Sequence, residues 1–150
     1  MKKLVVVAAV FTAITAIGIG VVTAQSNPIA ARMALMKANN DNARAVGEMI
    51  RGQAPFDAAK VEAAFAQWAD TAQKLPGLFP DNSKTGDKTR AAPKIWQTKA
   101  DFDAKAAAFA KAVADNRAKS AASLDGLKAS YPAVSTACSN CHEDYRLARQ

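Results

Sequence analysis

The sequence is poor in cysteine and histidine, the residue types that bind zinc and, for cysteine, form disulfides. Its 150 residues include two cysteines and one histidine. A structural zinc site needs four Cys or His ligands, so these three residues are too few to build one. A stabilising disulfide is also disfavoured, because Cys138 and Cys141 are three residues apart and a bridge between them would constrain little of the unfolded chain. The few soft ligands therefore need another explanation.

Charge of one sign is not clustered anywhere in the chain. The formal net charge is +7 at pH 7, and the basic residues are scattered among acidic and small ones. Nucleic-acid binding normally shows a basic patch or a recognisable motif, and the sequence has neither. We therefore expect no nucleic-acid partner, but a dispersed basic surface with some attraction for acidic partners.

The N-terminus has the features of a secretory signal. Two lysines precede an apolar stretch at residues 4–22, and the sequence Val-Thr-Ala at 22–24 supplies a signal-peptidase site. An uncleaved membrane anchor is the alternative, because the apolar stretch is long for a signal. We predict cleavage of residues 1–24, which places one domain, residues 25–150, in the periplasm without a membrane-embedded segment.

The rest of the chain is rich in alanine and shows helical rather than alternating periodicity. Apolar residues recur every three or four positions in four segments, and a polar connection at 80–92 separates the second from the third. Pro132 lies in the fourth segment, and because proline lacks a backbone donor we expect a kink or a short break there. Short connections between amphipathic helices favour antiparallel neighbours. The predicted fold is therefore all-α, an antiparallel four-helix bundle.

Each segment has a stripe of residues that should face the other helices. In the first segment, Asn27 is the expected N-cap and Pro28 the first helical residue, and Met49 falls out of phase with the stripe. The four predicted stripes are Ile29, Met33, Met36, Asn40, Ala43, Gly47 and Ile50; Val61, Phe65, Trp68, Ala72 and Leu75; Ile95, Trp96, Lys99, Phe102, Ala106, Phe109 and Val113; and Leu124, Leu127, Tyr131, Val134, Cys138, Cys141 and Tyr145.

Both cysteines and the histidine belong to one motif, Cys-Ser-Asn-Cys-His at residues 138–142. Cys-x-x-Cys-His is the attachment signature of c-type haem. On a helix the three side chains project to one side, so two thiols can join the haem vinyl groups while the imidazole meets the iron. We predict one covalently bound haem c, with Cys138 and Cys141 as tethers and His142 as the proximal iron ligand. A haem-free helical scaffold is the alternative.

Several stretches resemble the class II cytochromes c, the cytochrome c′ family. They are CSNCHEDYR near the C-terminus and, earlier in the chain, GQAPFDAAKV, LPGLFP and APKIW. The resemblance implies a cytochrome c′-like four-helix bundle that encloses the haem. It also implies a protein that is not an enzyme and that exchanges single electrons with other redox proteins. Members of the family often form homodimers through the first two helices, so both a monomer and a homodimer stay open.

The sixth ligand of the iron divides this family. His142 is the only histidine, which leaves methionines, and Met33 and Met36 both lie on the predicted stripe. The low-spin branch, the cytochromes c-556, binds the iron through a methionine of the first helix, and the register counted from Gly52 implies Met36 as the distal ligand. Thioether ligation raises the reduction potential and suits electron transfer. The alternative is a five-coordinate, high-spin cytochrome c′ that binds nitric oxide or carbon monoxide.

The resemblance also implies two arginines in the haem environment. Arg32, one turn before Met36, corresponds to a residue near the haem edge, where it would pair with a propionate. Arg146, one turn beyond His142, corresponds to an arginine at the proximal face. The alternatives are a plain surface charge for Arg32 and a cation that interacts favourably with the helix C-terminus for Arg146.

Overall fold

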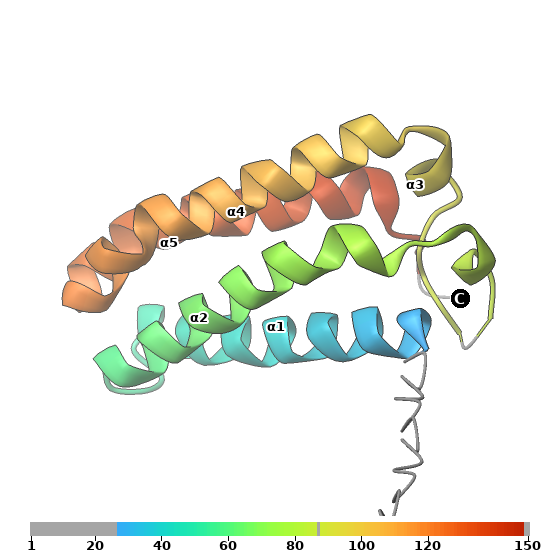
Figure 1. The fold of residues 1–150 in the computed structure, drawn as a ribbon. Helices are drawn as coiled ribbons and strands as arrows, with labels where there is room; N and C mark the ends of the chain where they lie inside the picture. Colours follow the sequence, from blue (N-terminus) through green and yellow to red (C-terminus); the bar gives the residue numbers. More distant parts are fainter. Residues whose placement is uncertain (1–26, 87, 149–150) are drawn as a thin grey trace, which may run out of the picture.

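Four long helices form the protein in the computed structural model, which describes residues 27–86 and 88–148 (Figure 1). The helices are α1 (Pro28–Ile50), α2 (Ala58–Lys74), α4 (Lys99–Ala122) and α5 (Leu124–Tyr145), with a one-turn helix α3 (Lys94–Gln97) and two 3-10 turns, η1 (Leu75–Leu78) and η2 (Asp81–Ser83), between α2 and α4. The predicted all-α four-helix bundle is confirmed. The predicted signal, residues 1–24, lies outside the described residues. Within the described part of the chain, no helix is both long and apolar enough to cross a bilayer.

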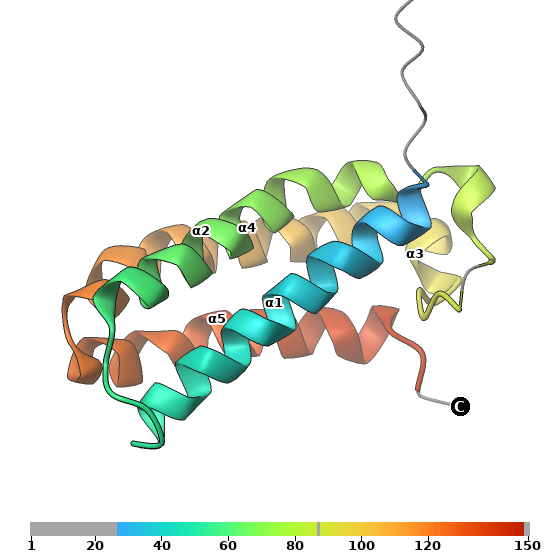
Figure 2. The same cartoon turned by 90° about the horizontal axis from the view of Figure 1, so that it is seen from below.

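The helices do not contact one another equally. α4 packs along α5 and α2, and α1 packs along α2, whereas direct contact between α1 and α5 is sparse. Figure 2, seen from below, shows α1 in front, running diagonally between α2 and α5, with α4 behind α2. The last helix, α5, is therefore anchored mainly through α4. Among the four neighbouring pairs of long helices, α1 and α5 are the least closely packed.

Side-chain caps fix where three of the helices begin. The Asn27 side chain accepts hydrogen bonds from the backbone N–H groups of Ile29 (3.0 Å) and Ala30 (3.3 Å). The Asp57 carboxylate accepts from the N–H of Lys60 at 3.0 Å, and the Ser123 hydroxyl accepts from the N–H of Gly126 at the same distance. Each cap satisfies backbone donors that the first helical turn leaves without a partner. The predicted caps at Asn27 and Asp57 are confirmed.

The buried face of α1 differs from the predicted stripe. Its buried residues are Ile29, Arg32, Val46 and Met49. Met33 is 44% exposed, and Asn40 is also on the surface. The predicted stripe was wrong at this point because it included Met33 and not the neighbouring Arg32. A buried arginine was not expected. Met49, which was judged out of phase, is 2% exposed and belongs to the core.

Two further local predictions need correction. The predicted third helix is interrupted at Thr98, whose backbone (φ −128°, ψ 51°) separates α3 from α4. The break expected at Pro132 is absent, since α5 runs through this residue. Pro132 removes the backbone donor that would reach the carbonyl of Lys128. Both residues are exposed, so water can satisfy that carbonyl.

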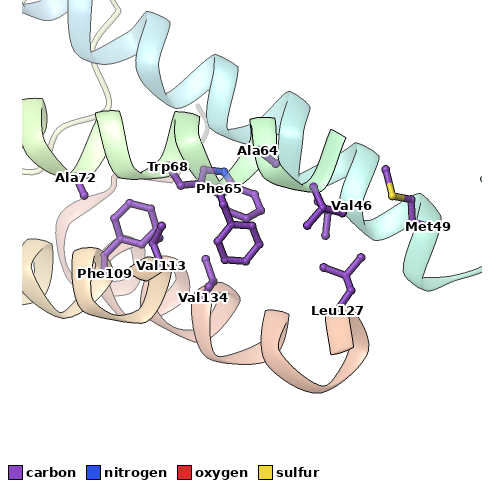
Figure 3. Packing of buried hydrophobic residues seen from close by; sticks show 11 residues of the cluster. Val46, Met49, Ala64, Phe65, Trp68, Ala72, Phe109, Val113, Leu127 and Val134 are labelled. Atoms are coloured by element: carbon purple, nitrogen blue, oxygen red, sulfur yellow. The ribbon is translucent and has the colours of Figure 1, made fainter. Parts of the chain in front are cut away.

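The buried apolar residues form two separate clusters. The larger one, here called the main core, is shown in Figure 3 and consists of Val46, Met49, Val61, Ala64, Phe65, Trp68, Ala72, Phe109, Val113, Leu127 and Val134. The smaller one, here called the small core, consists of Leu75, Ile95, Phe102 and Tyr145. All five residues of the predicted α2 stripe are buried, and they contribute to both clusters. The small core gathers around the last turn of α5, where the sequence motif lies.

Candidate functional site

The Cys-x-x-Cys-His motif occupies the last two turns of α5, and the side chains of Cys138, Cys141 and His142 are partly buried. Cys138 packs against the main core, whereas Cys141 packs against the small core. His142 follows directly on the helix. The motif therefore lies where the two clusters meet, on the helix that has sparse contact with α1.

Both cysteines are free thiols. Burial raises the pKa of Cys138 to about 11, with a further contribution from the charge of Cys141. Burial also raises the pKa of Cys141. Both groups are therefore protonated at neutral pH. Two reduced, protonated thiols on one side of a helix match the form in which an S–H group adds across a vinyl group.

His142 carries a neutral imidazole at neutral pH. Burial lowers its pKa, and the positive charges of Arg146 and Arg90 lower it further. A neutral imidazole keeps one nitrogen lone pair available for a metal ion. The environment of His142 thus favours the protonation state that an iron ligand needs.

Met36 of α1 shares a cluster with one cysteine of the motif. It is partly buried against the small core, the same cluster that Cys141 contacts. Met33 is 44% exposed, and Met49 is buried in the main core in the last turn of α1. Phase alone left Met33 and Met36 as candidates, and burial now separates them. Two neutral thiols could attach a haem covalently, and one neutral imidazole and one thioether could bind its iron. These four side chains therefore fit a covalently attached haem.

The position of α1 beside α2 is fixed by Asn39, one turn after Met36. The indole N–H of Trp68 donates to the backbone carbonyl of Asn39 at 3.3 Å, and the hydroxyl of Thr71 donates to its side-chain oxygen at 2.9 Å. Asn39 was not among the predicted residues, because the predicted stripe runs through Asn40. A stripe traced back from Val46 and Met49 would have included it.

Arg32 is buried, with 4% of its surface exposed. Its guanidinium donates to the Leu78 carbonyl (3.0 Å), the Ser83 hydroxyl (2.9 Å) and carbonyl (2.8 Å), and the Thr89 hydroxyl (3.0 Å). It also lies 4.7 Å from the centre of the Phe79 ring. The alternative of a plain surface charge is therefore wrong. Pairing of Arg32 with a haem propionate stays a prediction.

Arg146 lies just beyond the end of α5 in an extended conformation (φ −120°, ψ 120°), and its side chain is exposed. Its backbone N–H donates to the carbonyl of His142 at 3.1 Å. Its charge is close enough to lower the pKa of His142. The expected position near this helix terminus is confirmed, whereas a contact with a haem stays a prediction.

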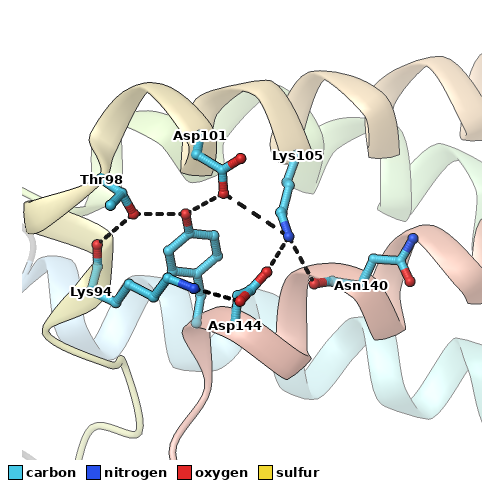
Figure 4. Close-up of polar contacts among 7 residues, drawn as sticks. Lys94, Thr98, Asp101, Lys105, Asn140 and Asp144 are labelled. Atoms are coloured by element: carbon cyan, nitrogen blue, oxygen red, sulfur yellow. Dashed lines mark hydrogen bonds and ion pairs between the residues drawn. The ribbon is translucent and has the colours of Figure 1, made fainter.

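A polar network holds the outer side of α5 against α3 and α4 (Figure 4). Asp144 forms ion pairs with Lys94, at 2.5 Å, and with Lys105. These two lysines lower the pKa of Asp144 to about 2 through hydrogen bonds. The hydroxyl of Tyr145 donates to Asp101 at 2.5 Å. This network could not be predicted from the sequence, because its members come from three helices and no spacing along one helix reveals it.

The chain is similar to known cytochromes over almost all of its described length. The sequence model of the family described as Cytochrome C′ matches residues 27–146. A cytochrome c′ of Rhodopseudomonas palustris is 42% identical over 144 residues, which cover 94% of this chain and 96% of the relative. A cytochrome c-556 of the same species is 40% identical over 129 residues, covering 83% and 86%. The structure of cytochrome c′ from Rhodopseudomonas palustris matches with a TM-score of 0.79 and 38% identity, and covers 84% of this chain and all of that chain.

Proposed function

The chain belongs to the cytochrome c′ family, and we propose that it is a periplasmic carrier of single electrons whose haem iron is bound by His142 and Met36. A c-type cytochrome of this family has covalently bound haem c with its iron. The haem supplies a metal centre that changes its charge by one electron. We assign Cys138 and Cys141 as the tethers, His142 as the proximal ligand and Met36 as the distal ligand.

The position of Met36 carries this proposal. Its side chain reaches the small core from α1, and Cys141 packs against the same cluster from α5. The hydrogen bonds from Trp68 and Thr71 to Asn39 hold α1 in place one turn beyond Met36. A methionine held in this way would be available as the second iron ligand beside His142.

A thioether in the sixth position makes the proposed function specific. It leaves no open position for oxygen or a substrate, and a methionine ligand raises the reduction potential. Helices packed on two apolar clusters also resist a change of shape when the charge of the iron changes. The proposed partners are therefore other redox proteins that donate and accept electrons, and we propose no catalysis by the chain itself. The proposed export rests on the predicted signal, residues 1–24.

A second candidate is a five-coordinate haem that binds nitric oxide or carbon monoxide. It would follow if Met36 stayed packed on the small core and did not bind the iron. The relatives favour neither candidate, because cytochrome c′ and cytochrome c-556 are similar to this chain to nearly the same extent. Family membership does remove support from the third alternative, a scaffold without haem.

Absorption spectra of the reduced holoprotein with and without carbon monoxide test the proposal. We expect a low-spin spectrum that the gas does not change, and we expect Met36→Ala to give a high-spin spectrum and rapid carbon monoxide binding. Met33→Ala is the matched control, because this exposed methionine lies on the same helix and should leave the spectrum unchanged. Rapid gas binding by the unaltered protein would favour the second candidate. An effect of Met33→Ala alone would show that the wrong methionine was assigned.

A further inference from the structure

We propose that Arg32 is a positioning residue that clamps the connection between α2 and α3 onto α1 and so keeps small ligands away from the Met36 side of the haem iron. The clamp itself follows from the contacts of Arg32. Its effect on the iron rests on the function proposed above, because it requires Met36 to be the distal ligand.

The clamp consists of four hydrogen bonds from one buried guanidinium. Its acceptors belong to Leu78, Ser83 and Thr89, which are 46, 51 and 57 residues away from Arg32 in the sequence. Ser83 is itself buried, at 1% exposure, and its hydroxyl also donates to the Pro80 carbonyl at 2.8 Å. Arginine suits this task because its planar group presents several donors in a fixed arrangement. One side chain therefore holds three places of the connection, Leu78, Ser83 and Thr89, against α1.

The connection held by Arg32 contributes the Phe79 ring, which packs among aromatic side chains of the small core. The Phe79 ring lies against the Arg32 guanidinium on one side, and its centre is 4.8 Å from that of the Phe102 ring. Phe79 and Met36 both pack against the small core. The indole N–H of Trp96 donates to the Phe79 carbonyl at 3.0 Å. Releasing the connection would therefore loosen the aromatic side chains that cover the cluster on which Met36 rests.

This arrangement differs from the propionate pairing that the family resemblance implies. In the clamp, the guanidinium already donates to two hydroxyl groups and two carbonyl groups of the connection. The clamp can be weakened from the opposite side, by changing Ser83 and Thr89 and leaving Arg32 and its charge in place. A propionate partner would be insensitive to that change, so the two roles are separable by experiment.

Amide hydrogen exchange of the holoprotein tests the clamp. The amides of Ser83 and Thr89 report on the connection, because they bond to the carbonyls of Pro80 and Gly86 within it. We expect these two amides to exchange at least about tenfold faster in Arg32→Met and in the double variant Ser83→Ala with Thr89→Val, relative to amides of α4 in the same sample. Arg44→Met is the matched control, since Arg44 is an exposed arginine of the same helix. If these two amides exchange as slowly in Arg32→Met as in the wild type, the clamp is overturned.

Carbon monoxide binding to the reduced holoprotein tests the effect on the iron. We expect carbon monoxide to bind Arg32→Met and the double variant and to change their spectra, and to leave the spectrum of Arg44→Met unchanged, like that of the wild type. Arg32→Lys should fall in between, because an ammonium cannot reach all four acceptors at once. Gas binding by Arg32→Met with no change in the double variant would favour propionate pairing and overturn the clamp as the cause. Faster exchange with unchanged gas binding would overturn the role beside Met36.

The outcome for the clamp is independent of the proposed function. If the wild type itself binds carbon monoxide rapidly, Met36 is not a stable ligand and the proposed function fails. Hydrogen exchange then still decides whether Arg32 holds the connection. If instead the wild type is low-spin and closed to the gas, the proposed function stands, and the variants decide the role of Arg32.

Discussion

The two ends of the bundle are stabilised by different means. At the end with the α1–α2 and α4–α5 connections, the main core packs eleven buried apolar residues from four helices. At the other end, the small core has four buried residues, and the chain there adds a buried arginine, a long connection and a network of ion pairs. The comparison suggests that stability and function can be altered separately.

Removing a buried phenylalanine from each end should give the largest effects. Phe65 of the main core is 0% exposed and Phe102 of the small core is 2% exposed. Because both leave a large cavity, Phe65→Ala and Phe102→Ala should each lower the free energy of unfolding of the holoprotein by about 3–5 kcal/mol, measured by urea denaturation. Only Phe102→Ala should also change the visible spectrum. A spectral change of the same size in Phe65→Ala would show that the two ends are not separate.

A methyl group at Gly126 should disturb the main-core end alone. A Cβ atom added there would lie 2.2 Å from the backbone carbonyl oxygen of Lys119, so the turn from α4 to α5 would have to shift. We expect Gly126→Ala to lower the free energy of unfolding by about 1–3 kcal/mol, the usual cost of overpacking. Gly77→Ala is the control, because a Cβ atom at Gly77 meets no atom within 4 Å. Equal unfolding midpoints for the two variants would contradict this expectation.

The phase of α1 can be tested with two neighbouring asparagines. Asn39 accepts the hydrogen bond of the buried Thr71 hydroxyl, whereas Asn40 is exposed. Asn39→Ala should lower the free energy of unfolding by about 1 kcal/mol, because it leaves that hydroxyl with one partner fewer. Asn40→Ala should change it by less than about 0.5 kcal/mol. The reverse order, measured by urea denaturation, would restore the stripe that the sequence predicted.

What could be predicted from the sequence follows the same division. The α2 stripe was predicted correctly because its apolar residues recur regularly and face the interior of the bundle, and local periodicity reports such packing directly. The fold class and the helix caps at Asn27 and Asp57 depend on local patterns in the same way. The haem motif is also local, so its place on one side of the last helix could be foreseen.

The errors fall where contacts join distant segments. The stripe of α1 was misplaced because Arg32 is buried only by virtue of acceptors in the connection, up to 57 residues away. The break at Thr98 was also missed. It lies beside α3, where Trp96 donates to Phe79, a contact that no spacing within the helix reveals. Periodicity cannot report a polar side chain whose burial is made favourable by a remote partner.

The ion pairs of Asp144 should have the smallest effect of the series. They join α5 to Lys94 and Lys105, but all three side chains are partly exposed, and such pairs contribute little in water. We expect Asp144→Asn to lower the urea midpoint of the holoprotein by less than Asn39→Ala does, and the difference from wild type to shrink in about 1 M NaCl, where exposed charges are screened. Asp41→Asn, which removes a more exposed pair with Lys37 within α1, is the control. Because Asp144 joins the haem-motif helix to α3 and α4, a visible spectrum that changes in Asp144→Asn but not in Asp41→Asn would mean that the network positions the motif as well as holding the helices together. An effect on stability as large as that of Phe102→Ala would show that polar contacts, and not the small core, dominate this end of the bundle.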